Sequence, residues 1–383
     1  MSYRQALNIG DLERLARKRL PASVFGFIAG GVQDNLSLAN NRAAFDRIRF
    51  KPRGLVDVSQ RAQDVTIFGH RFDSPFGIAP MGIAGIARFE ADIAMARAAS
   101  RMNVPFTLSS MSTVPMEQVA ASCDSVKWLQ VYLPGDRERA TAFVKRAANA
   151  GYQALLVTID VPVGANRENN LRSGFTLPLH LGPKVVVDGL LHPRWLAGVL
   201  ARTLMATGIP HLENSAMFER PSMLASANPI RSSGDRVDWA LMRWLRDQWR
   251  LPLLIKGVLH PADALEAVAC GLDGIVVSNH GGRQLDGAAA PVEVLPRISA
   301  AVSDKLTVIV DSGIRRGGDI LKAFALGADF TLCGRPALFG AAVGGEEGVL
   351  HALNMLKTEV DRDLALMGCA GMAALTPDSV DTQ

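Results

Sequence analysis

A histidine, an arginine and several glycines follow directly after a short apolar run near residue 280. Residues 274–277 read GIVV, and residues 278–287 continue without a spacer as SNHGGRQLDG. His280 can take up or release a proton near neutral pH, Arg283 offers a fixed cation, and the glycines would let a ligand approach the backbone. The alternative is an ordinary turn, in which glycines reverse the chain and polar side chains meet water. This stretch alone leaves both interpretations open.

Three further polar side chains end other apolar runs and would complete a reaction centre. Lys256 ends the run LPLLIK, so we expect its ammonium to point inward and stabilise developing negative charge. Tyr132 is one of only three tyrosines, and its phenol could hydrogen-bond a substrate oxygen. Asp160 could hold the imidazolium form of His280. The other histidines are expected to be structural or on the surface: His70, His180, His192, His211, His260 and His351.

Glycines and arginines gather after two later apolar runs. Residues 311–318 read DSGIRRGG, and residues 334–335 read GR. The backbone amides of Gly313 and Gly334 could therefore converge with the guanidiniums of Arg315 and Arg335, which are groups that bind phosphate. The alternative is ordinary loop glycines with arginines in solvent. We favour a phosphate site because both loops carry the same chemistry.

These groups need a scaffold that brings distant segments together, and eight apolar runs could supply it. Ala-rich segments with helical spacing, such as residues 91–99, separate the runs. Strands that alternate with helices indicate a parallel sheet, and eight such units indicate an α/β fold, the (β/α)8 TIM barrel. In such barrels the active site lies at the carboxyl ends of the strands, where the polar residues would meet. The runs span residues 76–80, 106–109, 128–132, 155–160, 253–256, 274–278, 307–311 and 330–333.

The spacing of the runs predicts a single domain over residues 1–383 with two additions. Residues 1–70 precede the first strand and are expected to form two or three helices that cover one end of the barrel. About 90 residues separate the fourth and fifth runs, so residues 165–250 are expected to form a long insertion after strand 4. The alternative fold is a doubly wound sheet, but the glycine-rich turn that usually opens such a sheet is missing here.

The composition is that of a globular, cytoplasmic protein without a nucleic-acid partner. The chain is 48% hydrophobic and 20% charged, and its net charge of +4 comes without a basic run interleaved with aromatics. The four cysteines are far apart and form no Cys-x-x-Cys pair, so we expect no metal site. The N-terminus is amphipathic rather than a signal peptide, and no apolar run reaches the length of a membrane span.

The chain resembles the FMN-dependent α-hydroxy acid oxidases and dehydrogenases over nearly its whole length. The string SNHGGRQLDG is the most specific part of this resemblance. The inserted residues 188–195 (DGLLHPRW) are most similar to the branch of bacterial L-lactate and mandelate dehydrogenases. The other matching segments are residues 20–21, 30–31, 41–45, 128–132, 157–162, 255–258 and 311–317.

The resemblance implies oxidation of an L-2-hydroxy acid to the 2-keto acid as FMN is reduced, with electrons passed to a quinone or another carrier. His280 would be the base, but whether it takes the hydroxyl proton beside a hydride transfer or the α-proton stays open. A homo-oligomer, a tetramer in relatives, is implied as well. Asp160, Tyr132 and Lys256 would assist catalysis, and Arg283, Arg167 and Tyr132 would contact the substrate. FMN would contact Pro80, Met81, Ser109, Gln130, Thr158, Lys256, Ser278, Asp311, Gly313, Arg315, Gly334 and Arg335.

One position departs from the pattern of the family. Relatives have a tyrosine six residues after the proline found here as Pro21, and its hydroxyl binds the substrate carboxylate, whereas this chain has Phe27. Met111 lies where relatives line the substrate pocket, although plain core packing is the alternative. We therefore expect either a larger, apolar, mandelate-like acid that packs on both side chains, or a substrate that presents something other than a free carboxylate there.

Two other functions stay open, a flavin barrel with a different kind of substrate and a non-catalytic flavin-binding module. A binding module needs no base, so the presence of His280 argues against it. The insertion could either contact the inner face of the cell membrane as a peripheral segment or fold over the active site as a lid. Its apolar residues are Leu190, Leu191, Trp195, Leu196, Val199 and Leu200, beside Arg194 and Arg202.

Overall fold

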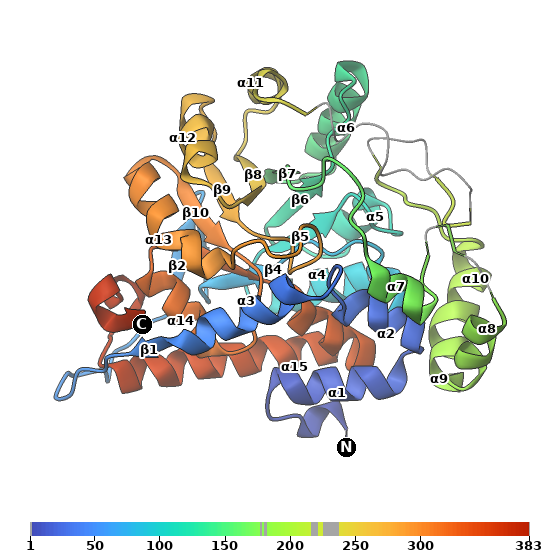
Figure 1. The fold of residues 1–383 in the computed structure, drawn as a ribbon, viewed down its shortest axis with the longest axis horizontal. Coiled ribbons are helices and arrows are strands. Elements are labelled where there is room, and N and C mark those ends of the chain that lie inside the picture. Colours follow the sequence, from blue (N-terminus) through green and yellow to red (C-terminus); the bar gives the residue numbers. More distant parts are fainter. Residues whose placement is uncertain (1, 177, 180–181, 216–220, 225–236, 383) are drawn as a thin grey trace.

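Eight parallel strands close into a barrel at the centre of the molecule (Figure 1). The computed structural model describes residues 2–176, 178–179, 182–215, 221–224 and 237–382. The strands follow chain order, and β11 pairs with β4 to close the barrel. The predicted TIM barrel is confirmed, and the doubly wound alternative is wrong because this sheet has no open edge. The strands are β4 (Phe76–Ile78), β5 (Phe106–Ser109), β6 (Lys127–Val131), β7 (Ala154–Thr158), β8 (Leu253–Val258), β9 (Gly274–Val277), β10 (Thr307–Val310) and β11 (Phe330–Cys333).

The barrel strands are almost entirely buried, because side chains fill the inside and helices cover the outside. This two-sided burial explains why their sequences are continuous apolar runs. The longest of the covering helices, α15, bends at Gly345, whose φ of 60° lies outside the helical region. The helices are α4 (Ala91–Arg101), α5 (Met116–Ala121), α6 (Arg137–Asn149), α11 (Trp239–Gln248), α12 (Pro261–Ala269), α13 (Pro291–Val302), α14 (Gly317–Ala325) and α15 (Arg335–Met367).

Short strands that the sequence analysis did not predict lie within residues 48–72. Strands β2 (Val65–Ile67) and β3 (His70–Phe72) form a hairpin, and Phe72 packs against Trp128 and Phe330, which lie at or next to the first residues of two barrel strands. This hairpin closes the amino-terminal end of the barrel, a place where we expected helices. Strand β1 (Ile48–Phe50) pairs with β12 (Val380–Thr382) near the C-terminus. Strands of three residues are too short to show a periodic pattern.

Three helices precede these strands. They are α1 (Ile9–Arg19), α2 (Ala22–Ala29) and α3 (Leu36–Arg47). Helix α1 packs on α15, α2 packs on the first helix of the insertion, and α3 packs on α13 (Figure 1). Helices α2 and α3 therefore bring the N-terminal segment to the carboxyl ends of the barrel strands.

The insertion leaves the barrel after β7 and returns at β8. Helices α8 to α10 lie at the right-hand edge of the molecule in Figure 1. Only part of the expected apolar face is exposed. Val199 is 6% exposed, Leu196 is half-buried, and the indole N–H of Trp195 donates to the carbonyl of Ile86 at 2.7 Å. The helical elements are α7 (Glu168–Ser173), α8 (Pro183–Leu190), α9 (Pro193–Trp195), a π-helical turn (Leu196–Ala201) and α10 (Arg202–Thr207).

Candidate active site

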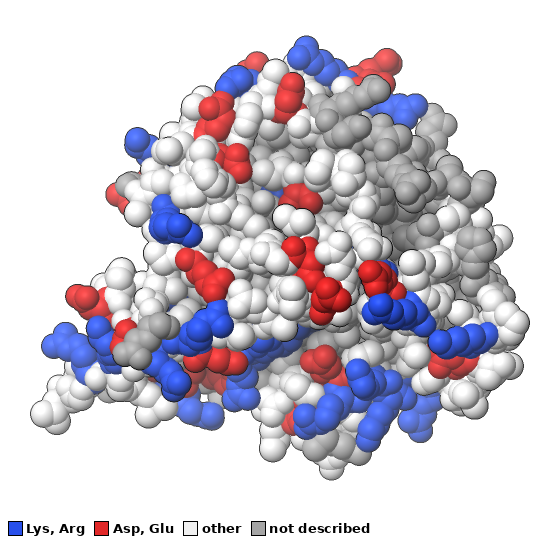
Figure 2. All heavy atoms as spheres, viewed as in Figure 1, with Lys and Arg blue, Asp and Glu red and all other residues white. Residues whose placement is uncertain are grey.

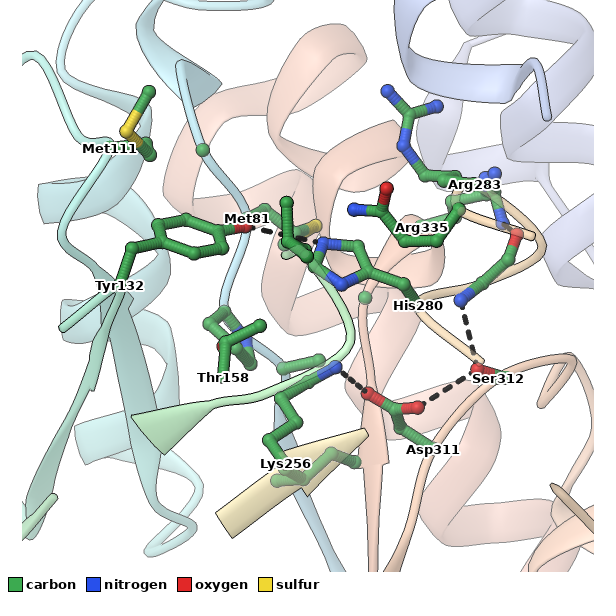
Figure 3. Close-up of a pocket in the computed structure, with 18 of the residues that line it drawn as sticks. Met81, Met111, Tyr132, Thr158, Lys256, His280, Arg283, Asp311, Ser312 and Arg335 are labelled. Atoms are coloured by element: carbon green, nitrogen blue, oxygen red, sulfur yellow. Dashed lines mark hydrogen bonds and ion pairs between the residues drawn. The ribbon is translucent and has the colours of Figure 1, made fainter. Parts of the chain in front are cut away.

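The carboxyl ends of the barrel strands surround one cavity, and His280 stands at its centre (Figure 3). Its Nδ1 lies 3.0 and 3.3 Å from the two carboxylate oxygens of Asp160. Because a carboxylate only accepts hydrogen bonds, Nδ1 carries the proton and donates it. The other ring nitrogen, Nε2, lies 3.4 Å from the hydroxyl of Tyr132. The free lone pair of the imidazole therefore faces the cavity beside a phenol.

The environment keeps this imidazole neutral at neutral pH. Burial lowers the pKa of His280, and the negative charge of Asp160 only partly opposes that shift. Burial alone would raise the pKa of Asp160, but the charge of His280 and its hydrogen bond bring it below the usual value. Burial raises the pKa of Tyr132, so its phenol stays protonated. The site thus holds a base that is ready to accept a proton, with an anion placed to stabilise the product of that transfer.

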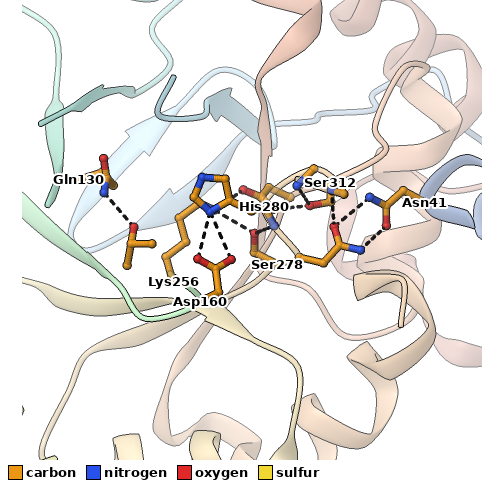
Figure 4. A network of polar contacts seen from close by, with 12 residues as sticks. Asn41, Gln130, Asp160, Lys256, Ser278, His280 and Ser312 are labelled. Atoms are coloured by element: carbon orange, nitrogen blue, oxygen red, sulfur yellow. Dashed lines mark hydrogen bonds and ion pairs between the residues drawn. The ribbon is translucent and has the colours of Figure 1, made fainter. Parts of the chain in front are cut away.

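Lys256 reaches the same centre from β8. Its ammonium donates to Ser278 Oγ at 2.9 Å and lies 3.1 Å from a carboxylate oxygen of Asp311. Burial would lower the pKa of Lys256, but Asp311 and Asp160 raise it above the usual value, so the ammonium keeps its charge. Ser278 Oγ also accepts the backbone N–H of His280 at 3.0 Å (Figure 4). One serine thereby positions both the cation and the base.

A buried chain of hydrogen bonds supports the opposite side of the cavity. Ser109 Oγ donates to Gln130 Oε1 at 2.8 Å, and Gln130 Nε2 donates to Thr158 Oγ1 at 2.9 Å. Thr158 lines the cavity, but Ser109 and Gln130 do not, and neither does Ser278. The structure therefore places these three predicted contact residues one step behind the cavity surface. The other predicted cofactor residues line it directly: Pro80, Met81, Thr158, Lys256, Asp311, Gly313, Arg315, Gly334 and Arg335.

Two cavity arginines also hold the end of α2. Arg283 Nη1 donates to the carbonyls of Phe27 and Gly30, each at 2.7 Å. Arg335 donates to the carbonyls of Ile28 and Gly30, both at 2.9 Å. The last carbonyls of a helix lack partners within the helix and carry partial negative charge, so cations are favoured there. The sequence analysis predicted anion contacts for both arginines but missed this second role.

Four cavity arginines have no carboxylate as an ion-pair partner among the described residues: Arg167, Arg283, Arg315 and Arg335. Burial and the nearby positive charge of Arg315 lower the pKa of Arg335 to about 9, yet the guanidinium remains protonated at neutral pH. Buried cations are costly without a counter-charge. The cavity is therefore built for anions, which fits both the phosphate of FMN and the carboxylate of an acid.

Two glycines after barrel strands make room for helix α3. A Cβ on Gly282 would lie 2.5 Å from the backbone nitrogen of Leu38 in α3, and one on Gly313 would lie 2.3 Å from the carbonyl oxygen of Asn41. Both glycines also have positive φ angles, 72° and 91°. Gly282 thus admits the backbone of α3 rather than a ligand, whereas Gly281 and Gly313 line the cavity. The side chains of Asn41 and Asn279 hydrogen-bond each other at this junction (Figure 4).

The wall on the insertion side of the cavity is apolar. Phe27 and Met111 line it as predicted, together with Ile83. The ring of Phe175 lies 4.3 Å from that of Phe27, and the guanidinium of Arg283 lies 5.0 Å from the same ring. Ile83 and Phe175 escaped the sequence analysis because they stand in irregular segments without a periodic pattern.

Two polar residues at the cavity were also missed. Ser312 accepts the N–H of Gly281 and donates to Asp311, both at 2.9 Å. Gln284 lines the cavity, and neither its amide nitrogen nor its amide oxygen has a hydrogen-bond partner in the described part of the chain. An unsatisfied buried amide costs about 1–3 kcal/mol, so this group indicates space for a hydrogen-bonding ligand. The sequence signal that could have identified Ser312 and Gln284 is their position in the segments DSGIRRGG and SNHGGRQLDG, which follow two barrel strands.

The other histidines lie away from this centre. His192 contacts Asp188, His260 caps α12, and His351 hydrogen-bonds the carbonyl of Ala6. His180 lies outside the described residues. Among the described residues no cluster of three or more His, Cys, Asp or Glu side chains could hold a metal ion.

Comparison with known proteins gives a consistent set of relatives. The family described as FMN-dependent dehydrogenase matches residues 16–382. The (S)-mandelate dehydrogenase of Pseudomonas putida is 41% identical over 377 residues, which cover 98% of this chain and 94% of that protein. The L-lactate oxidase of a Nostoc species is 40% identical over 371 residues, covering 95% of each. The crystal structure of the monotopic membrane protein (S)-mandelate dehydrogenase matches with a TM-score of 0.92 at 39% identity, covering 99% of this chain and 100% of that one.

Proposed function

The chain belongs to the FMN-dependent dehydrogenase family and is an FMN-dependent oxidoreductase, and we propose that it oxidises a large, apolar L-2-hydroxy acid to the 2-keto acid. The resemblance inferred from the sequence is confirmed, together with the cofactor and the enzyme class. The observation that carries the proposal is the His280–Asp160 pair, whose neutral imidazole faces Tyr132 in a cavity rich in cations. When bound, FMN supplies the acceptor for the two electrons that leave the substrate.

His280 is the base in this proposal. Its Nε2 accepts a proton from the substrate, and the imidazolium that forms is stabilised by the carboxylate of Asp160, 3.0 Å from Nδ1. The phenol of Tyr132, which stays protonated, donates a hydrogen bond to a substrate oxygen beside the base. Both groups are largely shielded from water, which strengthens these electrostatic interactions.

Arg167 and Arg283 bind the substrate carboxylate. Arg167 Nε donates to the carbonyl of Arg283 at 3.2 Å, and its two terminal nitrogens have no other hydrogen-bond partner among the described residues. Arg283 keeps one terminal nitrogen on the end of α2 and offers the other to the cavity. A planar guanidinium matches a carboxylate with two parallel hydrogen bonds.

FMN would be held from both ends by residues on the loops after β10 and β11 and on β8. The buried guanidiniums of Arg315 and Arg335, which form no ion pair with a described carboxylate, fit the phosphate together with the backbone of Gly334. The charged ammonium of Lys256 would stand near the flavin ring and favour negative charge there. The backbone at Pro80 and Met81 borders the same space.

The experiment that tests this function is anaerobic reduction of the flavin. The purified protein reconstituted with FMN should show a flavin spectrum that (S)-mandelate bleaches. A protein that stays colourless after reconstitution would overturn the proposal. A flavin that binds but is bleached by no hydroxy acid would favour the non-catalytic flavin module, whereas bleaching only by other reductants would favour a different substrate class.

We also propose that the tip of the insertion contacts a membrane surface and brings the enzyme to a quinone or another membrane-bound electron carrier. Leu190 and Leu191 are 61% and 73% exposed, and Val187 and Met205 are exposed as well. A solved structural relative is described as a monotopic membrane protein. Exposed apolar patches of this kind mark interaction surfaces. No described helix is long and apolar enough to cross a membrane.

Basic residues border this tip. Arg19 donates to the carbonyl of Val343, and Arg88 lies near the bend of α15, where a Cβ added to Gly345 would be 3.6 Å from its guanidinium. Burial lowers the pKa of Arg19, and the positive charges of Arg88 and Arg194 lower it as well. None of these three arginines forms an ion pair with a described carboxylate. Figure 2 shows Lys and Arg side chains along the whole lower part of the molecule, including its right-hand side, with some Asp and Glu side chains between them. Such a surface favours anionic headgroups.

The membrane proposal is tested by sedimentation with vesicles of phosphatidylglycerol at low salt. The wild-type protein should bind, and a Leu190→Asp/Leu191→Asp variant should bind at least tenfold more weakly. Leu366→Asp is the matched control, because Leu366 is 68% exposed on α15, away from the insertion. Equal binding by all three proteins would refute this role of the tip. Assembly into a homotetramer stays a prediction that light scattering of the purified protein would test.

A further inference from the structure

The insertion backs the apolar wall of the cavity with its own side chains. Leu212 and Met223 are buried and pack with Ile83, and Phe27 and Met111 pack against this cluster. Phe27, Ile83 and Met111 line the cavity, so the insertion side chains lie directly behind its wall. A change in the position of the insertion must therefore change the shape of the cavity.

This wall lies beyond the reacting groups. In the view of Figure 3, Met111 stands on the far side of Tyr132 from His280. A hydroxy acid whose reacting carbon sits beside His280 and Tyr132 would extend its side chain toward Met111. The cluster is thus placed to recognise the substrate side chain rather than its carboxylate.

Backbone hydrogen bonds join the two arms of the insertion at this point. The N–H of Leu179 donates to the carbonyl of Met223 at 2.9 Å. The N–H of Leu212 donates to the carbonyl of Pro221, and the N–H of Met223 donates to the carbonyl of Pro210, both at 3.0 Å. These bonds hold the two arms to each other, and the position of this layer relative to the barrel depends on its contacts with the barrel loops.

Asn214 provides that anchor. Its side chain is completely buried, at 0% exposure, although asparagine is mostly found on protein surfaces. Its amide nitrogen donates to the carbonyl of Val114 at 2.7 Å, and its amide oxygen accepts the N–H of Met116 at 2.8 Å. The same oxygen accepts from Arg146 Nη2 at 3.3 Å. The side chain of Asn214 thereby hydrogen-bonds both the backbone N–H of Met116 and the backbone carbonyl of Val114, at the end of the loop between β5 and α5.

That loop carries Met111. The N–H of Glu213 donates to the carbonyl of Ser112 at 3.0 Å, which adds a backbone link directly beside Asn214. The N–H of Ile83 donates to the carbonyl of Met111 at 2.9 Å, and a Cβ on Gly82 would lie 2.9 Å from Cβ of Met111. The loop, the turn after β4 and the insertion are therefore fixed as one unit, with Asn214 at their junction.

We propose that Asn214 is a positioning residue that determines specificity for the substrate side chain. It holds Leu212 and Met223 behind Phe27, Ile83 and Met111, which form an apolar subsite that takes an aryl or branched alkyl group. This inference rests on the proposed oxidation of a hydroxy acid. It adds that the base of the insertion, rather than the barrel alone, selects large apolar acids over small ones.

The test compares (S)-mandelate with L-lactate in an Asn214→Ala variant. The subsite contacts only the larger side chain, so kcat/KM for mandelate should fall about ten- to a hundredfold, mostly through KM. The value for lactate should change less than threefold, and the FMN spectrum should be unchanged. Asn149→Ala is the matched control, because Asn149 is an exposed asparagine on α6.

A second variant keeps the inference testable if Asn214→Ala does not fold. Leu212→Ala trims the subsite without touching the hydrogen bonds of Asn214, and it should lower the ratio of mandelate to lactate efficiency at least fivefold. An equal loss for both substrates, or an unchanged ratio in a folded variant with bound FMN, would overturn the inference. A wild-type enzyme that oxidises neither acid would instead refute the proposed function itself.

Discussion

A single added hydroxyl tests how the carboxylate lies in this cavity. Phe27 lines the cavity between the ring of Phe175, 4.3 Å away, and the guanidinium of Arg283, 5.0 Å away. Phe27→Tyr keeps the aromatic ring and its contact with the cation, so the change is close to the addition of one donor. The resemblance described for the sequence implies a tyrosine at this position that binds the substrate carboxylate. The variant therefore restores a donor beside the cation that we propose binds the same group.

The expected gain in the binding free energy of L-lactate follows from the negative charge of its carboxylate, which would accept the new hydrogen bond. A hydrogen bond to a charged group contributes about 1.5–3 kcal/mol. Since about 1.4 kcal/mol corresponds to a factor of ten, L-lactate should bind about ten- to a hundredfold more tightly to the variant. Small acids gain most visibly because they have little apolar surface to pack on Phe27 and Met111.

The assay is stopped-flow reduction of the flavin under anaerobic conditions, in which the dependence of the bleaching rate on L-lactate concentration gives Kd. Phe89→Tyr is the control, because Phe89 stacks under Arg202 in the turn before α4 and does not line the cavity. If Phe27→Tyr binds L-lactate no better than the wild type while FMN remains bound, the carboxylate lies elsewhere. The substrate orientation of relatives would then not apply to this chain.

The same geometry sets three further outcomes. His280→Gln should keep FMN bound, as its visible absorbance shows, while turnover falls about 100- to 10,000-fold; near-normal turnover would place the base elsewhere. Because burial lowers the pKa of His280 below 6.5 and Asp160 opposes that shift, kcat/KM should be constant above pH 6.5 and fall only at lower pH. In Asp160→Asn this acid limb should move to still lower pH, and a movement to higher pH would contradict the assignment. Asp92 accepts a hydrogen bond from Ser112, and burial raises the pKa of its carboxyl group to about 7. The contribution of this carboxyl group to the stability of the fold is therefore complete below about pH 4 and is lost as the pH rises through about 7. We expect the free energy of unfolding of Asp92→Asn, measured in urea, to rise relative to that of the wild type between pH 4 and pH 8, by an amount on the order of 4 kcal/mol. A difference in the free energy of unfolding that does not vary with pH would refute this.

The barrel and its reacting groups could be predicted because their signals are local. Each strand is buried on both faces, so it appears as a continuous apolar run, and the polar residue that follows it must lie at the functional end. Asp160, Lys256 and His280 were found in this way, and the structure brings them within one hydrogen-bonded network. The hairpin β2–β3 gave no such signal because each of its strands has three residues.

The features that sequence could not reveal depend on approaches between distant segments. Arg283 and Arg335 bind carbonyls of α2 that lie about 250–300 residues earlier in the chain, and no spacing rule predicts such a contact. Gly282 was expected to face a ligand, but α3 fills that space. Likewise, the anchoring role of Asn214 depends on where a long irregular segment meets the barrel. Tertiary contact decides the role of each of these residues.

The insertion was expected to be either a lid or a membrane-binding segment. Its base and its tip are held by different contacts. Glu213 and Asn214 fasten the base to the loop that carries Met111, so a movement there reaches the cavity. Trp195 fastens the tip to Ile86 through one indole hydrogen bond, while Leu191 stays exposed. Changes that leave these anchors intact should act independently, because distant sites without shared partners add in free energy. Removing the apolar tip side chains should therefore abolish vesicle binding and leave KM for mandelate unchanged. Loosening the base should raise KM for mandelate and leave vesicle binding unchanged.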